Sequence, residues 1–76
     1  MREYLRKIRK RAGFTQTQAA KEMGITQSYL SYIETGARQS EIKLGTLFRM
    51  AKCYRVSVIT LVQMESKYQE AKRGGE

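Results

Sequence analysis

The residues best suited to chemistry in this chain are uncharged hydrogen-bonding side chains between positions 27 and 35. They recur at spacings that place them along one side of a helix: Gln27, Ser28, Ser31, Tyr32 and Thr35. Amide, hydroxyl and phenol groups in such a row can form several directional hydrogen bonds at once, which is the chemistry of recognition. Groups for catalysis are scarce by comparison, because the 76 residues include no histidine and one cysteine.

Catalysis and metal binding have little support elsewhere in the sequence. Cys53 lies in an apolar helical stretch, and the chain has no glycine-rich phosphate loop and no spacing typical of metal ligands. The carboxylates of Glu22, Glu34 and Glu41 are scattered, as expected for surface or ion-pair residues. We therefore expect a protein that is not an enzyme and that needs neither a cofactor nor a metal.

The stretch from Thr15 to Gly36 predicts two short helices that would position the polar row. Thr15 and Thr26 are N-cap residues, and an apolar-periodic run follows each of them. Gly24 can adopt a positive φ in a sharp turn between the helices, and Gly36 can end the second one in the same way. Two capped helices joined by a glycine turn form a helix-turn-helix, which commonly places its second helix in the DNA major groove.

The residues of this stretch follow one another in the order TQTQAAKEMGITQSYLSYIETG. Over roughly residues 4 to 63 the chain resembles the Xre-type helix-turn-helix family, which includes the phage repressors and Cro. The resemblance implies an all-α, compact five-helix lambda-repressor-like DNA-binding domain with the helix-turn-helix at helices two and three. It also implies an ion pair between Arg9 and Glu34, which would tie the first helix to the recognition helix.

The same resemblance implies sequence-specific binding of double-stranded DNA by a small transcriptional regulator, most simply a repressor. Eight residues are candidates for contact with DNA: Gln16, Gln27, Ser28, Tyr29, Tyr32, Thr35, Arg38 and Lys43. Gln27 and Ser28 match base-contacting positions of the family, and a glutamine amide can bond adenine N6 and N7 together. Tyr32 matches a third such position, and Arg38 matches a phosphate-contacting one.

Other candidates have open alternatives. Gln16 begins a helix at its positive dipole end, where it can contact a phosphate or remain a plain surface residue. Tyr29 can contact DNA or pack at the edge of the core. Lys43 lies just before the fourth predicted helix, within reach of a phosphate.

Apolar periodicity predicts the remaining helices at 2–12, at 44–54 and from 58 onward. The helix at 44–54 offers a set of apolar side chains to the core: Leu44, Leu47, Phe48, Met50, Ala51 and Tyr54. Arg55 stands where the family favours glycine, so we expect it in the left-handed region at a cost on the order of 1 kcal/mol. Ser57 is then a cap for the fifth helix.

The fifth helix is expected to pack Val58, Leu61 and Val62 inward. Ile59 does not fit that inward stripe, and with Val62 and Met64 it forms apolar surface that a second subunit can cover. We therefore expect a homodimer. The domain is predicted at 1–65, followed by a polar C-terminal tail at 66–76 that prolongs the last helix by a turn or two.

The charge balance is strongly basic, with 15 Lys and Arg against seven Asp and Glu and a net charge of +8. Such a balance favours a polyanionic partner, with nucleic acid first and an anionic membrane surface second. No apolar run approaches the ~20 residues of a membrane span, and a single cysteine fits a reducing cytoplasm. We expect a cytoplasmic protein that binds an inverted-repeat operator. The alternative is a protein-interaction module, such as an antitoxin or a partner subunit, with the same fold.

Overall fold

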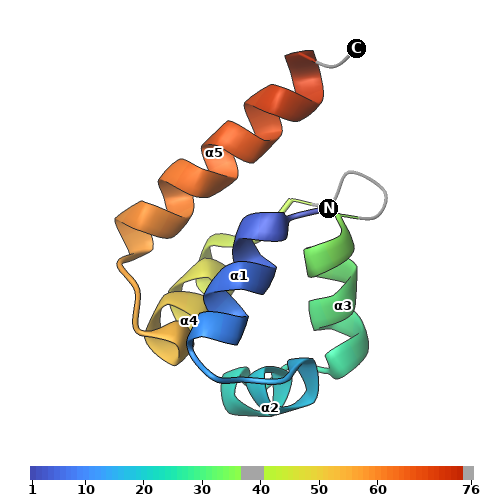
Figure 1. Ribbon diagram of the computed structural model, residues 1–76, viewed down its shortest axis with the longest axis vertical. Helices are drawn as coiled ribbons and strands as arrows, with labels where there is room; N and C mark the ends of the chain where they lie inside the picture. Colours follow the sequence, from blue (N-terminus) through green and yellow to red (C-terminus); the bar gives the residue numbers. More distant parts are fainter. Residues whose placement is uncertain (37–40, 75–76) are drawn as a thin grey trace.

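The structure is a computed structural model and describes residues 1–36 and 41–74. Five helices follow one another along these residues, with no strand between them (Figure 1). Their bounds are α1 Glu3–Arg11, α2 Gln16–Met23, α3 Gln27–Thr35, α4 Leu44–Tyr54 and α5 Val58–Gly74. Helix α2 packs against α3 and α4, α1 packs against α3, and α4 packs against α5. The predicted all-α, five-helix fold is confirmed.

Side-chain caps fix where the two central helices begin. The Thr15 hydroxyl accepts a hydrogen bond from the backbone N–H of Gln18 at 3.1 Å, and the Gln18 side chain accepts one from the Thr15 N–H at 3.0 Å. This reciprocal pair is a capping box, which satisfies two backbone donors at once. The Thr26 hydroxyl accepts from the N–H of Tyr29 at 3.0 Å. Both predicted N-caps are therefore confirmed.

Left-handed residues fix where three helices end. Gly24 follows α2 with a φ of 73°, and Gly36 follows α3 with a φ of 70°. Arg55 follows α4 with a φ of 57°, in the position where the sequence predicted a strained arginine. These residues end their helices abruptly, which allows α2 and α3 to meet through a turn of only three residues.

Gly36 has less space around it than Gly24. A Cβ atom on Gly36 would overlap the hydroxyl of Tyr68, whereas a Cβ on Gly24 meets nothing within 4 Å. We expect Gly24→Ala to lower the free energy of unfolding by about 1–2 kcal/mol through backbone strain alone. Gly36→Ala should lower it by about 1–3 kcal/mol more, because the alanine also displaces Tyr68. Urea unfolding of both variants measures this difference, and equal losses would contradict it.

The core is built from apolar side chains of all five helices. Its buried members are Leu5, Ile8, Ala19, Ala20, Met23, Leu30, Ile33, Leu47, Met50, Ala51, Tyr54 and Leu61. The two alanines are small enough for α2 to approach its neighbours closely. Phe14 packs at the edge of this core, with its ring centroid 6.2 Å from that of Tyr54.

Three expected core residues are not in the core. Leu44 and Phe48 of α4 are 61% and 53% exposed, and Val62 of α5 is 43% exposed. Leu44 and Phe48 lie four residues apart and so share one side of α4, which none of the described elements covers. The sequence identified these side chains as apolar, but the arrangement of the other helices leaves them at the surface.

The exposed apolar surface of α5 is smaller than expected. Ile59 and Val62 are exposed on the same side of the helix, and we call them the α5 apolar pair. Met64 is 37% exposed. It lies five positions after Ile59, which places it about 140° away around the helix axis. Met64 therefore does not extend the surface that Ile59 and Val62 form.

Candidate nucleic-acid interface

Helix α3 presents the predicted polar row on its outer side. Gln27 and Ser28, in the first turn, are exposed, as is Thr35 in the last turn. Tyr32 lies between them and is 38% exposed. Leu30 and Ile33 are buried on the opposite side of the helix, and Glu34 is buried at the edge between the two sides. Burial of one face therefore determines that the hydrogen-bonding face points to solvent.

Two of the candidates on α3 also contact the protein itself. The Thr35 hydroxyl donates a hydrogen bond to the backbone carbonyl of Tyr32 at 3.2 Å, which is a local bond at the helix end. Tyr29 is half-buried and packs against the core. Tyr29 therefore lies as expected for the alternative in which it packs at the edge of the core. The side chains of α3 most available to a partner are those of Gln27, Ser28 and Tyr32.

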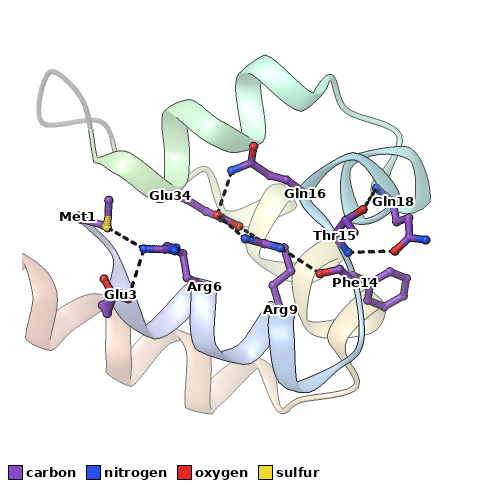
Figure 2. A network of polar contacts seen from close by, with 9 residues as sticks. All are labelled: Met1, Glu3, Arg6, Arg9, Phe14, Thr15, Gln16, Gln18 and Glu34. Atoms are coloured by element: carbon purple, nitrogen blue, oxygen red, sulfur yellow. Dashed lines mark hydrogen bonds and ion pairs between the residues drawn. The ribbon is translucent and has the colours of Figure 1, made fainter.

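The buried side of α3 is held by an ion pair that links it to α1 (Figure 2). Arg9 Nε donates to Glu34 Oε2 at 2.8 Å, and a second nitrogen of the same guanidinium lies 3.3 Å from Oε1. The two side chains are 9% and 2% exposed. Arg9 also donates to the backbone carbonyl of Phe14 at 3.0 Å. The expected pair between α1 and α3 is therefore present, and it reaches into the turn before α2.

Gln16 completes this network from the first turn of α2 (Figure 2). Its Nε2 donates to Glu34 Oε1 at 3.1 Å. A glutamine amide carries two donor hydrogens and an acceptor oxygen, so this bond orients the amide and leaves groups for a further contact. This bond could not be predicted from local sequence patterns, because the two residues are 18 positions apart on different helices.

Of the two predicted phosphate-contacting cations, the structure describes Lys43. Lys43 is exposed and is the residue directly before the first turn of α4. Arg38 lies outside the described residues. Among the candidates, the structure thus places Gln16, Lys43 and the α3 row on described parts of the chain, and it brings Gln16 and α3 into direct contact through Glu34.

Cys53 is a poor candidate for nucleophilic chemistry. It is half-buried in α4, and its burial, together with the charge of Glu22, raises the pKa of the thiol. The thiol therefore stays protonated at neutral pH, which is its unreactive form. Within residues 1–36 and 41–74, no three side chains of the metal-binding types come together. No helix in these ranges has the length and hydrophobicity that a membrane span needs.

Helices α2 and α3 form a helix-turn-helix, and the outer side of α3 is polar. A buried ion pair holds α3 against α1. These features are typical of a class of DNA-binding proteins. The profile of the helix-turn-helix family matches residues 5–61, which cover most of α1, all of α2 to α4 and the start of α5. The chain belongs to this family of Xre/Cro/CI-like proteins, which are DNA-binding transcription regulators. Searches of the curated proteins and of the solved structures found no significant match.

Proposed function

We propose that the protein is a sequence-specific regulator that binds double-stranded DNA as a homodimer, with α3 in the major groove. The observation that carries the proposal is the two-sided character of α3. Its outer side offers Gln27, Ser28 and Tyr32, and its inner side is fixed to α1 and α2 through Glu34. A rigidly held row of hydrogen-bonding groups is what recognition of base edges requires.

The side chains of α3 suit different parts of a base pair. The amide of Gln27 can bond adenine N6 and N7 together, and Ser28 can donate to or accept from any base. The ring of Tyr32 can contact a thymine methyl group. Gln27 and Ser28 lie in the first turn of α3, the part of a recognition helix that enters the groove in this docking geometry.

Phosphate contacts would supply the affinity that does not depend on sequence. Gln16 at the start of α2, Arg38 and Lys43 are the candidates, and the net charge of +8 attracts the DNA backbone. A bound dimer covers the DNA over two half-sites about one helical turn apart, which excludes polymerase there. Repression is therefore the simplest regulatory outcome.

Lys43→Ala tests a phosphate contact. We expect this variant to bind every DNA sequence more weakly and to reduce the slope of log affinity against log salt by about 1. Lys52→Ala is the matched control, because Lys52 is also exposed but lies near the other end of α4. Affinity measurements at several salt concentrations separate the two. A loss confined to one DNA sequence would instead assign Lys43 to base contact.

The α5 apolar pair is the candidate dimer contact. Ile59 is 68% exposed, the most among the large apolar side chains that the structure describes. We expect Ile59→Asp to shift the protein to monomer and to weaken operator binding by at least about tenfold, because each half-site then binds alone. Met64→Asp is the control on the other side of α5. Analytical ultracentrifugation measures the mass of each variant. An Ile59→Asp variant that still has the mass of a dimer would contradict this assignment.

Selection from a randomised duplex library at near-physiological salt tests the function as a whole. Recovery of a short inverted repeat, lost when Gln27 and Tyr32 are changed to alanine, supports the proposal. Recovery of nothing beyond salt-sensitive binding without sequence preference contradicts it.

The second candidate is a protein-interaction module of the antitoxin type. The exposed Leu44 and Phe48 on α4 favour it, because they offer apolar surface outside the α5 apolar pair. A partner protein that remains bound after nuclease treatment, and that is released by Phe48→Asp, would support this candidate.

A further inference from the structure

Arg2 is a buried cation whose bonds join three helices. Its side chain is 0% exposed. Nε and a terminal nitrogen donate to the two carboxylate oxygens of Glu65 at 2.8 and 2.9 Å, which is a bidentate pair with α5. Another terminal nitrogen donates to the backbone carbonyl of Ile33 in α3 at 2.7 Å. Because Arg2 directly precedes α1, its side chain connects the start of α1 with the end of α3 and the middle of α5.

Glu65 is held by several donors besides Arg2. The Tyr4 hydroxyl donates to it at 2.6 Å and the Gln69 amide at 2.8 Å. Burial by itself raises the pKa of Glu65, but the hydrogen bonds from Arg2, Tyr4 and Gln69 outweigh burial and leave the pKa below its usual value. The carboxylate is therefore ionised at neutral pH. The guanidinium carbon of Arg2 also lies 4.8 Å from the centroid of the Tyr68 ring, in a cation–π contact.

These contacts meet at the C-terminal end of α3. The backbone N–H of Arg2 donates to the carbonyl of Glu34 at 2.8 Å, and Figure 1 shows the N-terminus beside the end of α3. The carbonyls of Ile33 and Glu34 belong to the last turn of α3, where the intrahelical ladder ends, and the Ile33 carbonyl also accepts from the N–H of Gly36 at 3.2 Å. The negative end of the helix dipole also favours a cation there. Arg2 thus supplies both hydrogen bonds and charge to this helix end.

The side chains of this cluster lie outside the residues 5–61 that the family profile matches. Arg2 and Tyr4 precede the matched range, and Glu65, Tyr68 and Gln69 follow it. The matched range alone therefore leaves the end of α3 without its contact to α5.

We propose that Arg2 and Glu65 are positioning residues for DNA recognition, which fix the end of α3 to α5 and so set the angle of α3 in the groove. We call this pair, with its bond to the Ile33 carbonyl, the Arg2–Glu65 clamp. The proposal rests on the proposed function, since it assumes that α3 enters DNA. It also assigns the helical segment beyond residue 61 a part in the DNA-binding unit.

Glu65→Gln is the direct test, because glutamine keeps the size of the side chain and removes its charge. Circular dichroism establishes that the variant is folded at the assay temperature. We expect amide hydrogen exchange to accelerate in the last turn of α3, at Ile33 to Gly36, and to stay unchanged in α2 at Ala19 to Met23. Global destabilisation would accelerate both segments, so this contrast separates a local loosening of α3 from a general loss of stability.

The DNA measurement uses the duplex that the wild type selects and a random duplex of equal length. We expect the affinity of Glu65→Gln for the selected duplex to fall by about tenfold. Its affinity for the random duplex should stay within about twofold, because the phosphate contacts remain. Glu3→Gln is the matched control, because it removes the same charge from an ion pair at the surface. Glu3 pairs with Arg6 at 3.5 Å, and both residues are on α1. This control should change neither affinity.

A variant with an apolar pair keeps the test decisive if Glu65→Gln does not fold. Replacing Arg2 with methionine and Glu65 with leucine removes the buried cation and its half-buried partner together, which commonly preserves folding. This double variant cannot bond the Ile33 carbonyl, so we expect the same selective loss of affinity.

Folded variants that keep the wild-type ratio of specific to random binding would overturn the positioning role. A wild type that selects no sequence would instead overturn the proposed function, and the positioning role with it. In that case the exchange of the α3 amides still reports whether the clamp holds the helix end.

Discussion

Glu34→Ala is expected to lower the free energy of unfolding by about 3–5 kcal/mol, because it leaves the buried Arg9 guanidinium without its counter-charge. The loss is large for a domain whose whole stability is of the order of 5–15 kcal/mol. Glu34 is 2% exposed and accepts hydrogen bonds from both Arg9 and Gln16. Because the site is buried, water does not easily replace these hydrogen bonds when the carboxylate is removed. Thermal and urea unfolding, followed by circular dichroism, measure the loss.

The double variant with Arg9 changed to methionine and Glu34 to leucine is the informative comparison. It removes both charges and fills the space with apolar atoms, so we expect most of the lost stability to return. Glu22→Ala is a control, because Glu22 is exposed on α2. A single Glu34→Ala variant that unfolds like wild type would show that the pair is not needed to hold α1 and α3 together.

Gln27→Ala is expected to remove about 1–3 kcal/mol of discrimination at one base pair of each half-site. The affinity for the selected operator should fall by roughly 5- to 150-fold per half-site, as that energy implies. The affinity for random DNA should change little, because Gln27 is assigned no phosphate contact. Binding to the operator and to its single-base variants measures both quantities.

In Gln27→Ala, the preference for one base pair of the half-site should be lost. This outcome distinguishes Gln27 from a phosphate-contacting residue such as Lys43. Gln63→Ala is the matched control, because Gln63 is also an exposed glutamine but lies on α5. If Gln27→Ala lowered the affinity for all DNA sequences equally, Gln27 would be assigned to a phosphate contact and not to a base contact.

Local chemistry explains why the helix boundaries could be predicted. Thr15 and Thr26 cap α2 and α3 through bonds to residues three positions away, which any sequence of this type can form without the rest of the fold. Gly24 and Gly36 end these helices because a left-handed residue is easiest for glycine. Arg55 was predicted to adopt the same conformation, and its φ of 57° confirms it.

Apolar periodicity predicted which side of each helix is apolar but not how much of it is covered. Leu30, Ile33 and Leu61 are buried as expected, whereas Leu44 and Phe48 are exposed. Coverage depends on where the neighbouring helices lie, and the sequence of α4 does not contain that information. Met64 is a different case, because helix geometry alone separates it from the α5 apolar pair.

The sequence by itself determined the helix-turn-helix and the polar row of α3, because caps, turns and helical periodicity act over a few residues. The pairing of Arg9 with Glu34 could be expected only through the family resemblance. Only the tertiary structure decided that Arg2 pairs with Glu65, 63 residues away. A buried cation needs a counter-charge, but which carboxylate supplies it depends on the helices that packing brings together.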